Sequence, residues 1–184
     1  MRLRLILTLA CALAAASASA QWQQNGATIP DEAWRKADGD FGAMLLLTNQ
    51  PQEFVAEWAR GQSQPEGPRL RTTAAASRGD LVAAIILFTH CQAADTGMCR
   101  SYVDFKVLRP DGSTYATHRD VMLWNGPPPH GDSVQIGNAR LDFQVEKDDP
   151  FGIYEIHADV VDQVAQRKVS LVQALAVSEQ PAAK

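Results

Sequence analysis

The segment Val103-Asp104-Phe105-Lys106-Val107-Leu108-Arg109-Pro110-Asp111-Gly112 decides the fold class. Its apolar side chains alternate with Asp104 and Lys106, and this period of two is that of a β-strand with one buried face. Pro110-Asp111-Gly112 then predicts a tight turn, because proline fixes φ and glycine accepts a positive φ. The segment therefore predicts one strand of an antiparallel sheet and the turn that ends it.

Similar patterns recur on both sides of this segment. Residues 81–89 form a nearly continuous apolar run, typical of a central strand buried on both faces. Alternating runs follow at 114–117, 120–124, 141–146, 154–160 and 169–177. About seven short strands, roughly ten residues apart and without helices between them, predict an antiparallel β-sandwich. This pattern excludes parallel α/β folds, and the absence of a repeat disfavours a propeller or solenoid.

The first 20 residues are interpreted as a secretory signal peptide. Two arginines form a basic start, residues 5–15 are apolar, and Ala18-Ser19-Ala20 offers a cleavage site before Gln21. The apolar stretch is shorter than the ~20 residues of a membrane span, and no later segment is suited to cross a bilayer. A lipoprotein anchored through Cys11 is the minor alternative, because the usual leucine three places upstream is missing.

Composition limits the classes of partner. The chain has 184 residues, of which 46% are hydrophobic and 21% charged, as in an ordinary globular domain. Without the two leader arginines, the 17 basic residues become 15 against 21 acidic ones, a formal charge of −6. This charge argues against binding nucleic acid or anionic lipid. The alanine-rich leader and the lack of glycosylation sites favour a bacterial origin, so we expect a periplasmic or secreted protein.

The remaining chain divides into three parts. Residues 21–68 are predicted to be an N-terminal extension and linker, residues 69–178 the sandwich, and residues 179–184 a tail. The apolar run 41–48 suits either a buried strand or a turn of helix. A short helix is predicted over about 51–60, with proline in its first turn and Phe54 and Trp58 on one face, packed on the main domain. Trp22 and Trp34 are expected to dock on the same chain, the alternative being anchors for a partner.

A family resemblance supports the sandwich. The run Asp149-Pro150-Phe151-Gly152-Ile153-Tyr154 resembles the turn and tyrosine corner of immunoglobulin-like domains, and residues 103–112 are similar to a strand and turn of bacterial secreted modules of that kind. The resemblance covers about 69–178. Ile156 stands where the second inter-sheet cysteine of antibody domains would be, so the resemblance implies a core held by packing. By analogy it also implies binding rather than catalysis.

Two cysteines remain after the leader, and they flank a short loop. In an oxidising compartment we expect a structural disulfide between Cys91 and Cys99. The alternative is a metal site, because His90, Cys91, Met98 and Cys99 would suit Cu(I) if the thiols stayed reduced. No cofactor is expected otherwise.

The segment 124–131 is the candidate partner surface. Consecutive prolines favour a stiff polyproline II conformation, and tryptophan is a frequent interface anchor. The partner-binding residues predicted here are Trp124, Asn125, Pro127, Pro128 and Pro129. The alternative is a rigid loop whose Trp124 is tucked into the edge of the sandwich.

No catalytic motif is present in the sequence. We therefore expect that the chain is not an enzyme and works as a non-enzymatic binding module of the bacterial cell envelope, with an envelope protein as its partner. Its surface would combine loop 124–131 with loop 91–99. The alternative function is periplasmic copper binding through the His90/Cys91/Met98/Cys99 cluster. A third hypothesis, a hydrolase with a scattered site, would need titratable groups with shifted pKa values in a cleft.

Overall fold

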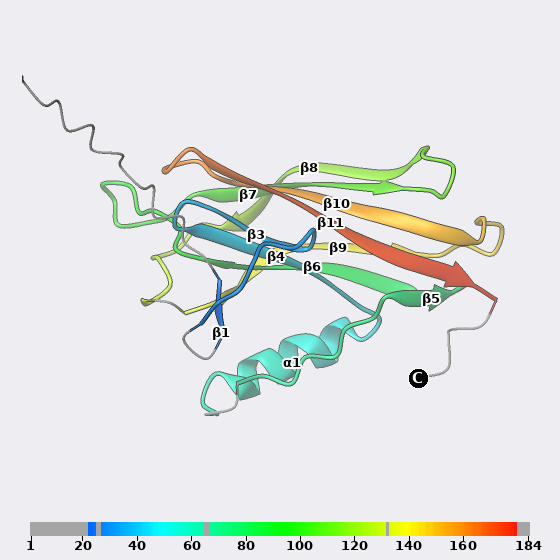
Figure 1. Cartoon of the computed structure of the whole chain (residues 1–184), viewed down its shortest axis with the longest axis horizontal. Coiled ribbons are helices and arrows are strands. Elements are labelled where there is room, and N and C mark those ends of the chain that lie inside the picture. Colours follow the sequence, from blue (N-terminus) through cyan, green and yellow to red (C-terminus); the bar gives the residue numbers. More distant parts are fainter. Residues whose placement is uncertain (1–21, 25–26, 65–66, 132, 180–184) are drawn as a thin grey trace, which may run out of the picture.

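The fold is a two-sheet β-sandwich with one helix on its outside. A computed structural model describes residues 22–24, 27–64, 67–131 and 133–179. The predicted signal peptide 1–20 and most of the predicted tail 179–184 lie outside the described residues. The two sheets form stacked layers, and α1 lies against the outer side of the lower layer as drawn in Figure 1.

The elements follow one another as short strands interrupted by the helix. Their bounds are β1 (Gln23–Gln24), β2 (Ala27–Thr28), β3 (Arg35–Asp38), β4 (Phe41–Thr48), α1 (Pro51–Gly61), β5 (Ala75–Ser77), β6 (Leu81–Thr89), β7 (Ser101–Leu108), β8 (Thr114–Trp124), β9 (Gln135–Gln144), β10 (Gly152–Asp162) and β11 (Arg167–Ser178). Strands β1 and β2 form a separate two-stranded hairpin. No helix in the described part of the chain is long and apolar enough to cross a membrane.

The four-stranded sheet has the order β3-β4-β6-β9, with all its strands antiparallel. Strand β4 is therefore an interior strand, paired with β6 from Gly42 to Thr48. The sequence-based boundary at residue 69 is wrong at this point, because β3 and β4 belong to the sandwich. The apolar run 41–48 is a strand buried on both faces, which explains why its pattern has no clear period.

The five-stranded sheet has the order β5-β11-β10-β7-β8. It is antiparallel except for the short β5, which pairs in parallel with the end of β11. Strand β8 unites the two predicted strands at 114–117 and 120–124. Its register against β7 shifts in three places, and Asp120, the first residue of the second predicted run, has a φ of 52°. The sandwich thus has nine strands rather than about seven.

Alternation along the strands produces the inner core. Side chains of both sheets that point inward are almost completely buried, including Phe105 of β7, Leu141 of β9 and Ile156 of β10. Burial of a large apolar side chain stabilises a fold by roughly 1.5–3 kcal/mol. The core between the sheets is therefore the main source of stability, as expected for a sandwich without an inter-sheet disulfide.

Helix α1 forms a second core on the outer face of the four-stranded sheet. Phe54 and Trp58 are 1% and 8% exposed, and they cluster with outward side chains of β6 that include Ile85. The predicted helix and its packing face are confirmed. Its end is fixed by Gly61, which lies so close to the backbone of Pro68 that any Cβ at position 61 would clash.

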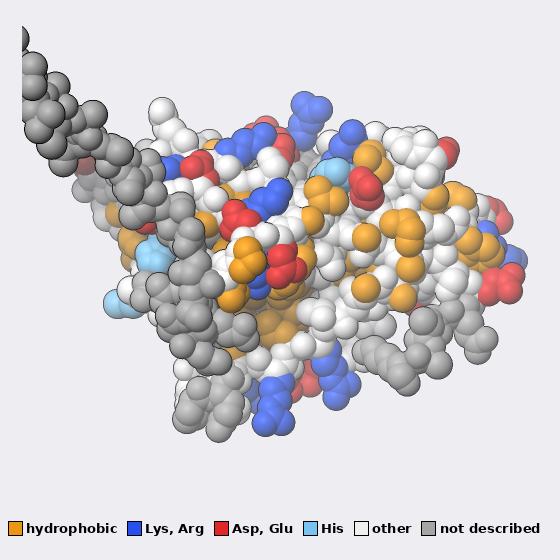
Figure 2. All heavy atoms as spheres, viewed as in Figure 1, with side chains coloured by type: hydrophobic (Ala, Val, Ile, Leu, Met, Phe, Trp, Pro, Cys, Tyr) orange, Lys and Arg blue, Asp and Glu red, His pale blue; other side chains and the backbone are white. Residues whose placement is uncertain are grey.

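The N-terminal tryptophans lie against the chain itself. Trp22 is 9% exposed, and its ring packs on Gly42, where a Cβ would come within 2.8 Å of the ring. Trp34 is half-buried, donates its ring N–H to Glu32 and lies under the guanidinium of Arg35. On the face shown in Figure 2, basic and acidic side chains are interspersed rather than segregated.

Candidate functional site

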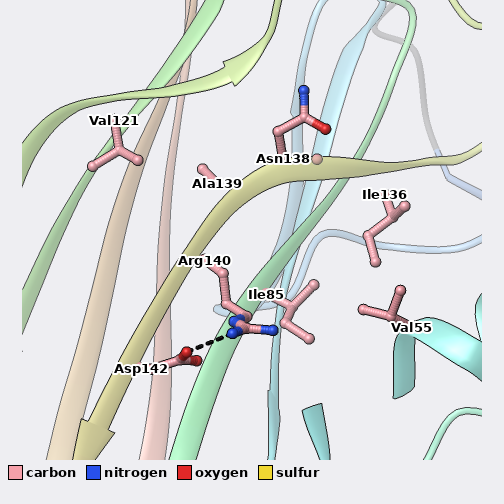
Figure 3. A pocket seen from close by; sticks show the side chains of 9 residues that line it. Val55, Ile85, Val121, Ile136, Asn138, Ala139, Arg140 and Asp142 are labelled. Carbon is pink, nitrogen blue, oxygen red and sulfur yellow. Dashed lines mark hydrogen bonds and ion pairs between the residues drawn. The ribbon is translucent and has the colours of Figure 1, made fainter. Parts of the chain in front are cut away.

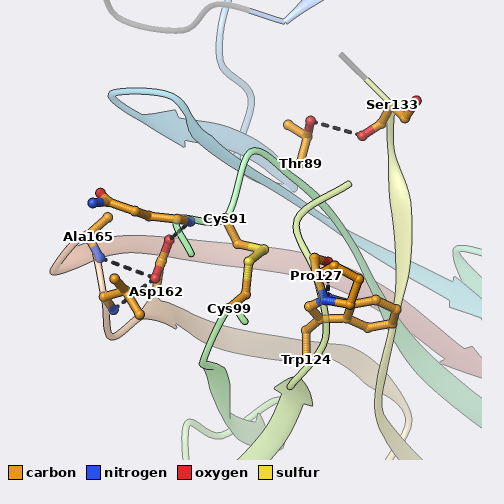
Figure 4. The surroundings of a disulfide bond; sticks show 10 residues. Thr89, Cys91, Cys99, Trp124, Pro127, Ser133, Asp162 and Ala165 are labelled. Atoms are coloured by element: carbon orange, nitrogen blue, oxygen red, sulfur yellow. Dashed lines mark hydrogen bonds between the residues drawn. A yellow bond between two sulfur atoms is a disulfide. The ribbon is translucent and has the colours of Figure 1, made fainter. Parts of the chain in front are cut away.

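The candidate site lies at the end of the sandwich that carries the predicted disulfide. Cys91 and Cys99 are bonded, with their Cα atoms 5.9 Å apart, and both residues are buried. The predicted disulfide is confirmed. It closes loop 91–99 between the end of β6 and the start of β7, beside the ends of β8 and β10 (Figure 4).

Loop 124–131 is attached directly to this disulfide loop. The backbone N–H of Cys99 donates a 2.8 Å hydrogen bond to the carbonyl of Gly126. The indole N–H of Trp124 donates to the carbonyl of Pro127 at 2.9 Å, and its ring lies 5.7 Å from that of Phe88. Trp124 is half-buried and packs against the inner core. Its hydrogen bond and ring packing hold the loop in place.

A buried carboxylate supports the disulfide loop from the other side. Asp162, at the end of β10, is 0% exposed. One carboxylate oxygen accepts the backbone N–H of Gln92 at 2.7 Å, and the other accepts those of Val164 and Ala165 at 3.0 and 3.3 Å. These bonds compensate for the loss of solvent around the carboxylate. They also fix loop 91–99 relative to the turn between β10 and β11.

These loops line an open pocket of about 360 Å³, which we call the disulfide-end pocket. Its walls combine proline rings, the disulfide and a few polar side chains. The lining residues are Asp40, Phe41, His90, Cys91, Gln92, Pro128, Pro129, Gly131, Ala165 and Arg167. A volume of this size is at the lower end of that of small-ligand sites.

Two opposite charges lie at the pocket. The guanidinium of Arg167 is held by Asp38 at 3.1 Å and lies over Gly39, where a Cβ would displace it. Asp40 follows in the same turn and lines the pocket. His90 has a φ of 55°, and its Nδ1 lies 2.9 Å from the hydroxyl of Thr89. The side chains of Arg167 and His90 are thus positioned by direct polar contacts.

The predicted partner residues are distributed unevenly around the pocket. Pro128 and Pro129 line it, while Asn125 and Pro127 are exposed beside it and Trp124 packs inward. Gln92 lies in the predicted loop 91–99, whereas sequence reasoning missed Asp40 and Arg167, which come from two other segments. It also missed Asp162, although an aspartate directly before a turn is a known signal of local hydrogen bonding.

The disulfide removes the thiols from the predicted metal set of His90, Cys91, Met98 and Cys99. A sulfur already bonded to another sulfur is not a thiolate ligand. Within the described residues, no group of three or more His, Cys, Asp or Glu side chains is arranged to hold a metal ion.

The opposite end of the sandwich contains a second polar cluster. The hydroxyl of Tyr154 donates to the carbonyl of Pro150 at 3.1 Å, which is the bond of a tyrosine corner. The hydroxyl of Tyr115 lies 2.8 Å from the carboxylate of Asp149 and 2.8 Å from the carbonyl of Gln144. Burial, and then the hydrogen bond to Asp149, raise the pKa of Tyr115 to about 12. A phenol with a raised pKa serves as a structural donor rather than as a base near neutral pH.

Comparison with known proteins finds solved structures with similar folds but no matching family. No protein-family model and no curated protein sequence matches the chain. A CARDB domain from Pyrococcus furiosus, solved in complex with di-metal ions, is 13% identical, with a TM-score of 0.34 over 57% of this chain and 80% of that one. A Niemann-Pick type C2 protein from Japanese carpenter ant is 13% identical, with a TM-score of 0.36 over 56% of this chain and 79% of that one. Both are β-sandwich-type domains.

A third similar structure corrects one expectation. It is a family 123 glycoside hydrolase from Clostridium perfringens, 8% identical, with a TM-score of 0.43 over 77% of this chain. The chain spans 28% of the length of that hydrolase. The prediction that the chain is not an enzyme is therefore withdrawn. A likeness at this level assigns neither an enzymatic nor a non-enzymatic role.

Proposed function

We propose that the chain is a binding module exported to the bacterial cell envelope, in the periplasm or outside the cell. The leader-like residues 1–20 and the disulfide between Cys91 and Cys99 support this proposal, because disulfides persist in oxidising compartments. The partner is an envelope protein. Its contact surface is the disulfide-end pocket together with the exposed Asn125 and Pro127 beside it.

The hydrogen bond from Cys99 to Gly126 is the observation that carries the proposal. It joins two loops that are separate in sequence and that both line the pocket. The disulfide restrains one loop, and the prolines and the Trp124–Pro127 bond restrain the other. A surface that is rigid before binding loses less conformational entropy when a partner docks. Because the two loops are held together, they form a recognition surface that is already rigid before a partner docks.

The pocket also indicates what kind of partner segment fits. Pro128, Pro129 and Phe41 offer apolar walls, while Asp40 and Arg167 place opposite charges at the same cavity. A protruding apolar side chain with polar neighbours would satisfy both kinds of surface. We infer that the partner inserts such a side chain from an exposed loop or strand.

Partner capture with pocket variants tests the proposal. The changes Pro128→Ser with Pro129→Ser alter the pocket wall, and Asn125→Ala with Pro127→Ala alters the exposed part of the loop. The matched control is Thr117→Ala with His118→Ala, at exposed positions on β8 away from the pocket. Envelope proteins crosslinked to each variant in the producing cells are quantified by mass spectrometry.

We expect one partner to fall by about tenfold or more with the loop variants and to be retained with the control, as for residues central to an interface. Equal recovery with all variants would refute the proposed surface. The intact mass of the protein purified from the envelope without reductant tests export separately. A chain that begins at Gln21 and carries the disulfide is expected, whereas an uncleaved chain with free thiols would argue against export.

A further inference from the structure

Within the described residues, the stretch from Arg140 to Gln144 of β9 is a regular segment of free sheet edge. The sheets end at β3, β5, β8 and β9. Strands β3 and β5 have only four and three residues, and β8 is interrupted by three register shifts and the left-handed Asp120. Short strands and irregularities are the usual protection of sheet edges. Strand β9 has ten residues, and its register against β6 shifts between Ile136 and Arg140. From Arg140 to Gln144 it pairs with β6 without a shift.

A groove of about 350 Å³ runs along this edge. Val121 of β8 borders it on one side, and Val55 of α1 and Ile136 border it on the other (Figure 3). Val55 is 44% exposed although it is apolar. At the far end the hydroxyl of Tyr115 bonds to the carbonyl of Gln144. An additional strand laid along the groove would cover these apolar side chains and pair with the edge.

The backbone groups of Arg140 and Asp142 face the free edge. Val145 directs both its N–H and its carbonyl toward residues 79 and 80, just before β6. Because successive residues of a strand turn these groups to opposite sides, those of Phe143 and Leu141 face β6 and those of Asp142 and Arg140 face away. In the described residues, no backbone hydrogen bond outside the strand ladders involves Arg140 or Asp142.

The side chains at these positions are complementary to a second copy of themselves. Arg140 and Asp142 are exposed and form a 2.6 Å ion pair within one strand. If two β9 strands pair in antiparallel fashion about Leu141, Arg140 of one copy lies opposite Asp142 of the other, and the reverse pair forms by symmetry. A shift of the centre by one residue places two arginines or two aspartates opposite each other, which is unfavourable. The charges therefore select one register.

We propose that the protein forms a two-fold dimer through its β9 edge. The two copies pair antiparallel about Leu141, with four backbone hydrogen bonds between Arg140 and Asp142 of each copy and their counterparts. The two four-stranded sheets become one continuous sheet of eight strands. Such an interface is isologous, as in most homodimers. It lies apart from the disulfide-end pocket, so this inference is independent of the proposed binding function.

Charge-reversal variants test the dimer. Mass is measured by sedimentation equilibrium at concentrations from about 1 μM to about 1 mM, which bracket weak and moderate affinities. In the proposed dimer, position 140 of each copy lies opposite position 142 of the other. Arg140→Asp therefore places two aspartates opposite each other in both of these pairs, and Asp142→Arg places two arginines opposite each other. We expect each variant alone to raise the dimer Kd by about tenfold or more. Lys106→Glu, at an exposed position of the other sheet, is the matched control and should leave the Kd unchanged.

Mixing the two variants provides the decisive measurement. In a one-to-one mixture of Arg140→Asp and Asp142→Arg, every opposing pair again combines an acid with a base, so a heterodimer should form with a Kd close to that of the original protein. The backbone amides at positions 140 and 142 should exchange hydrogen more slowly in this heterodimer than in either variant alone. Far-UV circular dichroism spectra that match that of the original protein verify that the variants fold. A protein that stays monomeric, a dimer insensitive to both reversals, or a mixture that fails to associate would each overturn the proposal.

Discussion

The hydroxyl of Tyr115 and the carboxylate of Asp149 lie 2.8 Å apart, and this contact connects the two sheets at the end opposite the disulfide. Tyr115 belongs to the edge strand of the five-stranded sheet, and Asp149 belongs to the loop that leaves the four-stranded sheet. Asp149 also accepts the N–H of Glu146 at 2.6 Å, and its carbonyl accepts the guanidinium of Arg78. Hydrogen bonds from both sides of the sandwich thus hold the loop between β9 and β10 in place.

Stability should fall at alkaline pH through Tyr115. Its pKa rises from 10.0 to about 12 on folding, so the neutral phenol is the form favoured in the folded state. The stability that Tyr115 contributes through this neutral form is fully present below its pKa in the unfolded state. It is lost as the pH rises through its pKa in the folded state. In urea unfolding, the stability advantage of the original protein over Tyr115→Phe should therefore shrink between pH 10 and about pH 12. An advantage that stays constant over this range would contradict the assignment.

Removal of the disulfide should destabilise the fold without abolishing it. Closing a loop of this size is worth roughly 2–3 kcal/mol in the entropy model. Cys91→Ala with Cys99→Ala should lower the free energy of unfolding in urea by about that amount. Reduction of the original protein with a thiol should produce a similar loss. Unchanged stability after reduction would mean that the bond does not form in solution.

Even a conservative substitution of the buried Asp162 should lower the stability of the fold. Asp162→Asn replaces one acceptor oxygen by an amide nitrogen that cannot accept the backbone N–H groups now bound there. We expect a loss of about 1–3 kcal/mol in the free energy of unfolding. Asp148→Asn, at an exposed position, serves as the control and should change it by less than about 0.5 kcal/mol. Equal effects of the two changes would contradict the role assigned to Asp162.

The outer core beneath α1 should contribute substantially to stability. Trp58 is 8% exposed and packs against the four-stranded sheet, so Trp58→Ala should cost about 3–5 kcal/mol in chemical denaturation. Val55→Ala, one turn earlier and 44% exposed, should change stability by less than about 0.5 kcal/mol. If the two substitutions had equal effects, α1 would not be docked as described.

The sequence predicted those elements whose pattern is local. Strands β7 and β10 alternate strictly and are buried on one face, so their period reveals them. The helix was recognised by its Phe54/Trp58 face and the tyrosine corner by the run before Tyr154. Strand β4 could not be assigned to the sandwich from its pattern, because α1 covers its outer face and the other sheet covers its inner face. Its partner β6 lies beyond the helix and a loop, so no hairpin signal joins them.

The pocket was predictable only in part for a similar reason. Loops 91–99 and 124–131 carry visible signals, namely two cysteines and three prolines. Asp40 and Arg167 come from opposite ends of the chain, and no spacing rule connects them. Whether Trp124 points inward depends on its packing against Phe88, a tertiary contact that the sequence pattern does not reveal. Sequence patterns indicated where the loops are, and packing determined which of their residues face the pocket.

The contact between the first and last strands of the sandwich has a consequence for the order of folding. The N–H of Val172 donates to the carbonyl of Ala33, and Arg167 and Lys168 both donate to Asp38. One side of the sandwich is therefore completed only when β11 is available, after almost all of the chain has been synthesised. Contacts this distant in sequence slow folding. A nascent chain that ends before Arg167 has no partner for these groups and should stay unfolded until its last strand emerges.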